Sequence, residues 1–220
     1  MPSAAELLDR LGRPGDVRLG AARGGAIPRL ATGLDALDEA LGGGLPRGRI
    51  TELAGPRSTG RTGLTCAIAA SATRTGETIA WVDPEDTLDP ESAAKAAIAL
   101  ERTLWVRPRD VTGALTAAEV LLGAGGFGLV VLDLGSAEAR AWPRLAHAAE
   151  RTRSTLLVLT ARRQAGTFAA VGLETTGRRV CWSGGRGRLV LLDGIEARVA
   201  VVRSRIGRPG RTLVVRQVGA

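Results

Sequence analysis

The apolar positions along the chain fall into short runs that alternate with longer segments of helical character. Apolar runs at residues 50–54, 78–83, 104–106, 129–134 and 155–160 predict strands. The segments near residues 63–74, 92–100, 112–122 and 142–151 lie between these runs and predict helices. Because strands and helices alternate in this way, we expect an α/β fold with a mostly parallel central sheet.

The two ends of the chain depart from this alternation. Residues 1–28 begin with a capping-box pattern and continue into a Gly-, Arg- and Pro-rich stretch, which predicts a short helix and a flexible linker. From about residue 178 the pattern changes to β-rich segments that are broken at Gly184-Gly185, Asp193-Gly194 and residues 207–210. Such breaks are typical of hairpins, so we expect the core domain, residues 29–220, to end in an antiparallel extension.

The net charge of +8 is concentrated in the C-terminal third. Residues 1–139 hold 14 Lys and Arg against 18 Asp and Glu, a net charge of −4, whereas residues 140–220 hold 16 against 4, a net charge of +12. A basic surface of this kind attracts an acidic partner, above all nucleic acid. Arg186 and Arg188 of the extension are therefore candidate DNA ligands, and a solvated arginine-rich surface is the alternative.

Cysteine and histidine are too scarce for several classes of site. Cys66 and Cys181 are the only cysteines and are expected to be free thiols, and the single His147 excludes a His-based metal cluster. No apolar run approaches the length of a membrane span, and residues 1–11 lack the features of a signal peptide. These observations predict a cytoplasmic protein that does not enter a membrane.

Residues 50–63 read as a strand, a glycine-bracketed loop and the start of a helix. Gly55, four intervening residues and Gly60 match the spacing of a phosphate-binding loop, in which main-chain N–H groups surround phosphates. Thr62 holds the position whose hydroxyl binds Mg²⁺, and Asp133, at the end of an apolar strand, is the candidate second Mg²⁺ ligand. Glu85 is the candidate catalytic carboxylate that aligns the attacking water. The loop residues expected to bind the nucleotide are Gly55, Ser58, Thr59, Gly60, Arg61 and Thr62.

Arg61 stands where such a loop has its lysine. A lysine reaches the β and γ phosphates as a compact charge, whereas the planar guanidinium requires bidentate geometry. Losing one well-placed charge stabiliser costs roughly 3–4 kcal/mol in the transition state. The substitution therefore predicts weak or absent hydrolysis of ATP with Mg²⁺. Because Lys95 is the only lysine in the chain, a general drift toward arginine is an alternative explanation.

Segments before and after the loop resemble the core of the RecA recombinases. The resemblance rests on residues 31–38 (Ala-Thr-Gly-Leu-Asp-Ala-Leu-Asp), residues 43–52, the loop itself and residues 81–90 (Trp-Val-Asp-Pro-Glu-Asp-Thr-Leu-Asp-Pro). It implies a RecA-like P-loop fold over about residues 31–160. It also implies that Glu85 is the catalytic glutamate of an active member.

Residues 104–109, 127–133 and 203–210 are similar to segments of the ImuA family. These RecA-like proteins, sometimes called SulA-related, are accessory factors of SOS-induced translesion synthesis, a mutagenic DNA-damage response. The resemblance implies ImuB as a partner and, through ImuB, the error-prone polymerase DnaE2. Contact with RecA itself or with DNA, and recruitment to the nucleoid after damage, are further implications.

The chain departs from the RecA pattern where recombinases contact DNA and sense the γ-phosphate. Residues 134–154 have room for one helix only, so the first DNA loop is expected to be missing, and Thr160-Ala161 replaces the Asn-Gln sensor. Gln164 would substitute only through a shift of register. Residues 161–177 occupy the place of the second DNA loop. Phe168 in this stretch is expected to be a buried core residue, and it is otherwise the candidate for stacking on a base. The candidate phosphate ligands in this stretch and directly after it are Arg162, Arg163, Arg178 and Arg179.

Three functions remain open at this point. The leading one is a non-catalytic adaptor in translesion synthesis, because the lysine, the sensor and one DNA loop are all missing. The second is an active DNA-dependent ATPase that modulates RecA filaments, which the presence of Glu85, Asp133 and Thr62 favours. The third, a cell-division inhibitor, is suggested only by the SulA-related name.

Overall fold

The computed structural model describes residues 27–135, 138–184, 190–205 and 209–217. The helix and nearly all of the linker expected in residues 1–28 lie outside these ranges, as do Arg186 and Arg188. The strands are β1 (Arg29–Leu30), β2 (Leu45–Pro46), β3 (Ile50–Ala54), β4 (Ile79–Val82), β5 (Thr103–Val106), β6 (Leu129–Asp133), β7 (Thr155–Thr160), β8 (Ala169–Ser183), β9 (Leu191–Ser204) and β10 (Thr212–Gln217). The helices are α2 (Asp35–Leu41), α3 (Arg61–Arg74), α4 (Pro90–Lys95), α5 (Val111–Ala124) and α6 (Trp142–Thr152), with short 3-10 turns η1 (Leu100–Arg102) and η2 (Gly166–Phe168).

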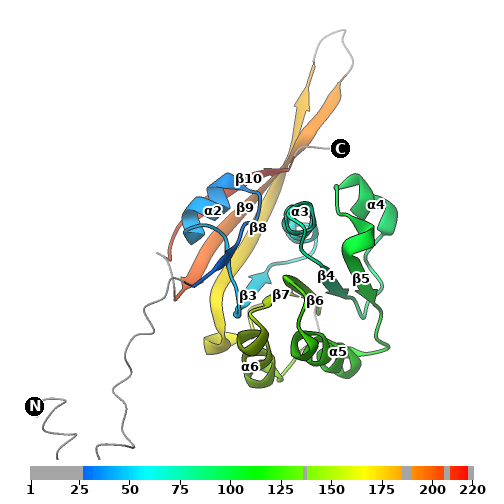
Figure 1. Ribbon diagram of the computed structural model, residues 1–220. Coiled ribbons are helices and arrows are strands. Elements are labelled where there is room, and N and C mark those ends of the chain that lie inside the picture. Colours follow the sequence, from blue (N-terminus) through cyan, green and yellow to red (C-terminus); the bar gives the residue numbers. More distant parts are fainter. Residues whose placement is uncertain (1–26, 136–137, 185–189, 206–208, 218–220) are drawn as a thin grey trace, which may run out of the picture.

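Eight strands form one sheet in the order β10-β9-β8-β3-β7-β6-β4-β5. The six strands from β8 to β5 run parallel, whereas β9 and β10 pair antiparallel beyond β8. Figure 1 shows helices on both faces of this sheet, with α3 and α4 on one side and α5 and α6 on the other. The predicted α/β fold with a mostly parallel sheet and an antiparallel C-terminal region is therefore confirmed.

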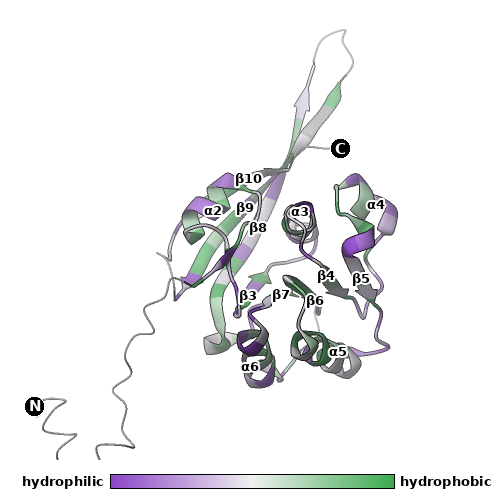
Figure 2. Cartoon of the chain, in the orientation of Figure 1, coloured by the Kyte–Doolittle hydropathy of each residue, from purple (hydrophilic) through white to green (hydrophobic). Residues whose placement is uncertain are grey.

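Alternate residues of the central strands build two separate cores. In β7, Leu157 and Leu159 pack in the core on the α3 side, while Leu156 and Val158 pack in the core with α5 and α6. Successive side chains of a strand point to opposite faces, and a sheet covered on both faces requires apolar residues at every position. This explains why these strands appear in the sequence as unbroken apolar runs, which are green in Figure 2.

Strand β8 differs from the sequence-based expectation in two ways. It begins at Ala169, before the expected start near residue 178, and it pairs parallel with β3 as far as Glu174. The expected second loop, residues 161–177, was therefore too long, because residues 169–177 already belong to the sheet. The sequence pattern misled because Gly172 and Gly177 lie inside the strand, where glycine usually marks a break.

The expected hairpin at Asp193-Gly194 was also wrong. Gly194 lies within β9, opposite Cys181, at a point where the register of the β8–β9 pair shifts. A glycine of this kind marks an irregularity inside a strand rather than a turn. Beyond Glu174, β8 pairs only with β9, and β10 accompanies β9 as far as Ile195. Past that point β8 and β9 continue as a two-stranded ribbon (Figure 1). None of the helices within the described ranges is long and apolar enough to span a membrane.

Candidate functional site

The loop between β3 and α3 lies at the carboxyl edge of the parallel strands. Ser58 has a φ of 63° and Gly60, the N-cap of α3, has a φ of 94°, so the chain turns sharply before the helix. The first turn of α3 has no acidic residue. Its free N–H groups and the positive end of the helix dipole therefore favour an anion at this point.

Strands β8 and β9 hold the loop from its outer side. The hydroxyl of Thr175 lies 2.6 Å from the hydroxyl of Thr59, which also donates to the Pro56 carbonyl over 2.8 Å. A Cβ on Gly55 would lie 2.1 Å from the Thr175 hydroxyl, and one on Gly60 would lie 2.8 Å from the Cβ of Ala197. Both loop glycines are therefore required by close packing against the C-terminal strands, in addition to their place in the motif.

Arg61 is buried beneath the loop, with an exposed fraction of 9%. Its Nη1 donates to the carbonyl of Gly55 over 2.9 Å and to the carbonyl of Thr160 over 2.5 Å. The guanidinium thus joins the ends of β3 and β7, and its Nε has no hydrogen-bond partner among the described residues. The cation that replaces the lysine is therefore engaged with the main chain rather than directed freely into solvent.

Glu85 is positioned by the turn after β4. The buried carboxylate of Asp83 accepts hydrogen bonds from the N–H groups of Thr87 and Leu88, at 2.7 and 2.8 Å, which fixes the turn that presents Glu85. The Glu85 carboxylate lies 3.1 Å from the guanidinium of Arg57. It also fills the space beside Gly135, where an added Cβ would lie 2.4 Å from its Oε1.

Asp133 ends β6 and is nearly inaccessible to solvent. Burial raises the pKa of its carboxyl above the ordinary value of 3.8, and the nearby charges of Asp83 and Glu85 raise it further. The N–H of Gly135, which donates over 3.1 Å, and the charge of Arg61 act in the opposite direction on this pKa. Burial and the neighbouring acidic groups disfavour the ionised carboxylate of Asp133, and a bound cation would stabilise it.

These residues surround one cavity of about 330 Å³. The structure brings together the predicted residues Ser58, Gly60, Arg61, Thr62, Glu85 and Asp133, and it adds Arg57, Thr87 and Arg178. Among the described residues, no three His, Cys, Asp or Glu side chains form a metal cluster. The donor set fits Mg²⁺ bound to a triphosphate, because Mg²⁺ is usually held by one or two protein ligands together with phosphate oxygens.

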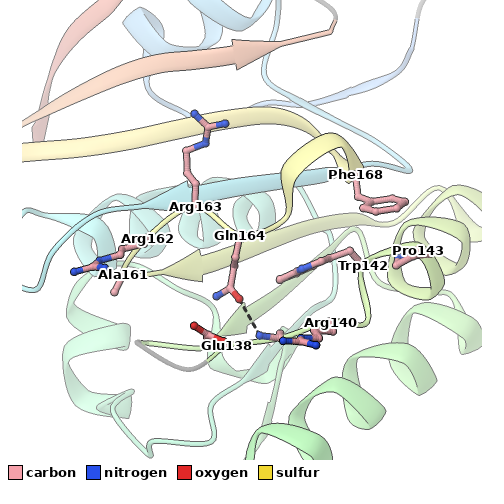
Figure 3. Close-up of a pocket in the computed structure, with 10 residues that line it drawn as sticks. Glu138, Arg140, Trp142, Pro143, Ala161, Arg162, Arg163, Gln164 and Phe168 are labelled. Atoms are coloured by element: carbon pink, nitrogen blue, oxygen red, sulfur yellow. Dashed lines mark hydrogen bonds between the residues drawn. The ribbon is translucent and has the colours of Figure 1, made fainter.

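A second cavity, of about 840 Å³, lies between the loop after β7 and the start of α6. Figure 3 shows its walls, which come from residues 138–143 on one side and residues 161–168 on the other. Arg140, Arg162 and Arg163 contribute positive charge, and Trp142 and Phe168 contribute aromatic surface. Phe168 is 43% exposed, so it is available to a ligand and is not a core residue.

Glu52 holds the loop that lines the second cavity and was not identified from the sequence. Its side chain, 1% exposed in the middle of β3, accepts hydrogen bonds from the N–H groups of Gln164 at 2.6 Å and Ala165 at 3.0 Å. The Gln164 side chain accepts a hydrogen bond from the N–H of Ala139 over 2.8 Å and lines the second cavity (Figure 3). The signal in the sequence was a single carboxylate inside an otherwise apolar strand, because such a residue needs buried partners.

The candidate DNA-binding arginines do not form one group. Arg162 and Arg163 lie at the second cavity, where Arg163 is 3.7 Å from the carboxylate of Glu174. Arg178 lies at the first cavity, and Arg179 is paired with Glu196 over 2.9 Å. The sequence placed Arg162 and Arg163 in the second loop and Arg178 and Arg179 directly after it, but β8 carries the last two away from the first two.

Comparison with known proteins places this geometry in a family. The model of the RecA N-terminal domain matches residues 3–145. The RecA protein of Ectopseudomonas oleovorans is 41% identical over 130 residues, which cover 59% of this chain and 37% of that protein. The RecA protein of Methylococcus capsulatus is 47% identical over 108 residues, which cover 49% and 31% of the two chains. The matched part thus spans about a third of the length of these relatives.

A solved structure extends the likeness to the C-terminal strands. The crystal structure of the RadB recombinase superimposes with a TM-score of 0.65 and covers 85% of this chain and 95% of its own. At 21% identity this match shows a shared fold. The match of residues 3–145 to the RecA N-terminal domain shows that the chain belongs to the RecA family.

Proposed function

We propose that this chain is a RecA-like adaptor in translesion DNA synthesis, with weak or no ATP hydrolysis. The observation that supports it is the position of Arg61, whose guanidinium is bound to the carbonyls of Gly55 and Thr160. A cation held in this way supports the fold and is not free to follow the charge that develops on a transferred phosphoryl group. In this proposal the RecA-like core serves to bind partner molecules on its surface, and it does not serve as a catalyst.

The nucleotide cavity would hold ATP with Mg²⁺ without turning it over efficiently. The loop N–H groups and the start of α3 would bind the phosphates, and Thr62 and Asp133 would hold the metal. Bound Mg²⁺ would supply neutralisation of the phosphate charge. Glu85 lies at the cavity, but its contact with Arg57 lowers its availability as a group that orients water.

The partners proposed for the adaptor are ImuB, DnaE2 through ImuB, and RecA or DNA. The similarity of residues 104–109, 127–133 and 203–210 to the ImuA family supports the protein partners. The second cavity supports DNA, because positive charge beside an exposed aromatic side chain, here Phe168, is the pattern of single-strand binding sites. Arg140 and Arg162 would contact phosphates there and Phe168 would stack on a base.

ATP turnover by the full chain tests the central claim. Turnover is measured with and without single-stranded DNA, for the unchanged protein and for Arg61→Lys. We expect slow turnover that DNA does not stimulate, and an increase in Arg61→Lys because a lysine does not need both carbonyls. Robust turnover that DNA stimulates, and that Arg61→Lys leaves unchanged, would refute the adaptor.

A pull-down with ImuB tests the partner. Chains lacking residues 1–28 are compared with the full chain, and the C-terminal ribbon is probed by point substitution at Trp182 rather than by deletion. Deletion of the ribbon strands would remove Ala197, Val199 and Val201, which belong to the core. Binding that survives both changes would place the interface on the remainder of the core.

One observation favours the second function, a DNA-dependent ATPase. Glu85, Asp133 and Thr62 come from three separate elements, and the structure brings all of them to one cavity. Such convergence is the arrangement that phosphoryl transfer requires. The turnover experiment separates this function from the adaptor, because only the ATPase predicts stimulation by DNA.

A further inference from the structure

Strand β8 extends beyond the nucleotide loop and forms one wall of its cavity. The parallel pairing of β3 with β8 ends at Ala54 and Glu174, and Gly55 begins the loop directly after that point. Residues 175–183 continue in the same direction, paired only with β9 (Figure 1). In parallel α/β sheets ligands bind at the carboxyl ends of the strands, so this part of β8 lies beside the place where a ligand is expected.

One face of the extended pair is turned toward the loop. Directly opposed residues of an antiparallel pair share a face, and Arg178 is opposite Ala197. Ala197 is the residue against which Gly60 packs. Arg178 therefore lies on the face that covers the loop, and it lines the same cavity as Thr62 and Asp133. Its neighbour Arg179 points to the other face, where it is paired with Glu196.

The three arginines of the cavity differ in what they bind. Arg57 is paired with Glu85, and Arg61 is held by two main-chain carbonyls. Arg178 is exposed and forms no salt bridge with any residue that the structure describes. It also borders another pocket, whose charged lining residues are Arg179, Arg198 and Glu196. The cation in this cavity that remains available to an anion is therefore Arg178.

We propose that Arg178 binds the phosphates of a nucleoside triphosphate, a role that the loop lysine has in the usual motif. The proposal rests on the proposed function only in that the cavity holds a nucleotide, and it does not depend on whether hydrolysis follows. The planar fork of arginine suits bidentate contact with phosphate oxygens. The positive charge is thereby moved from the loop to a strand that reaches the site from a distant part of the sequence.

Binding through Arg178 would also connect the nucleotide with the ribbon. Val180 and Trp182 follow Arg178 at alternate positions, so they share its face, and both are exposed. A triphosphate held between α3 and Arg178 would restrain this part of β8, which is otherwise paired with β9 alone. The nucleotide would thus influence a surface that is free to meet a partner.

Equilibrium binding by the full-length chain tests the proposal, with no need for turnover. The probe is a non-hydrolysable ATP analogue with Mg²⁺, and binding is followed by calorimetry. We expect Arg178→Ala to weaken binding about tenfold or more, because a charge-assisted contact to phosphate is lost. Arg179→Ala removes the same charge from the adjacent residue on the opposite face and is expected to change affinity less than twofold. Arg178→Lys should lie between the unchanged protein and Arg178→Ala.

Comparison of ligands separates phosphate contact from a general effect. If Arg178 binds the terminal phosphates, Arg178→Ala should reduce the preference for the ATP analogue over AMP. Thermal unfolding of each variant without ligand confirms that the fold is kept. The proposal is overturned if the unchanged chain does not bind the analogue, if Arg178→Ala binds it normally, or if Arg178→Ala and Arg179→Ala weaken binding equally. If DNA stimulates ATP turnover while Arg178→Ala still weakens binding of the analogue, the adaptor is refuted and the assignment of Arg178 stands.

Discussion

The two cavities at the carboxyl edge of the sheet use their arginines in different ways. In the cavity at the β3–α3 loop, Arg61 is buried and bound to main-chain carbonyls, so its charge serves the fold. In the second cavity Arg140 and Arg162 are exposed, and neither forms a salt bridge in the part of the chain that the structure describes. The same residue type is therefore a structural connector in one place and available to a ligand in the other. Variants at each place should separate stability from binding.

Arg61→Ala should have the largest effect on stability. The change leaves the carbonyl of Gly55 without its side-chain donor and leaves a gap where the guanidinium was. Loss of two charge-assisted hydrogen bonds from a buried group should lower the free energy of unfolding by about 3 kcal/mol. Urea unfolding measures the change. Arg162→Ala is the matched control and should stay within about 0.5 kcal/mol of the unchanged chain, as exposed positions usually do. Equal losses in both variants would contradict the contrast.

Glu52→Ala should have the next largest effect, and it would loosen the loop at the second cavity. The substitution removes the acceptor for the N–H groups of Gln164 and Ala165. Buried donors left without a partner cost about 1–3 kcal/mol, so we expect a loss of about 2 kcal/mol in the free energy of unfolding. Glu52→Gln keeps one acceptor oxygen and should lose less. Hydrogen exchange of residues 161–168 should become faster, and unchanged exchange there would refute the assigned role.

Local pattern was sufficient to predict much of the fold. Strands β3 and β7 were predicted to the residue, because each apolar run is bounded by charged or small residues such as Arg49 and Gly55. The sequence also identified the loop, Glu85 and Asp133, since each follows a recognisable strand. It did not predict the contacts of Arg61 and Glu52 or the place of Arg178 at the first cavity. Those positions depend on which strands become neighbours, and the order β8-β3-β7 brings together segments that are far apart in the sequence.

Asp133→Asn should stabilise the protein at neutral pH while weakening Mg²⁺-dependent nucleotide binding. The pKa of Asp133 is raised in the folded state, chiefly by burial, so the folded state binds a proton more tightly than the unfolded state does. The unchanged chain therefore loses stability as the pH rises from 3.8 through the raised pKa, and this loss is complete above it. Asparagine removes the penalty. Thermal unfolding from pH 8 to pH 4.5 should show a gain for Asp133→Asn that shrinks as the pH falls. A gain that grows toward acid would contradict the sign of the shift.

Arg162→Ala should have the smallest effect on the fold and a defined effect on DNA. If Arg162 contacts one phosphate of a single strand, its loss should reduce the slope of log affinity against log salt by about 0.7. Binding of a fluorescent oligonucleotide, followed by anisotropy from 50 to 200 mM salt, measures this slope. Arg109→Ala is the control, because it removes the same charge at an exposed position outside both cavities. A slope that changes equally in both variants would show a general response to net charge. The second cavity would then not be a specific DNA-binding site. A slope that changes only in Arg162→Ala, with stability unaltered, would establish that the two cavities divide their arginines between the ligand and the fold.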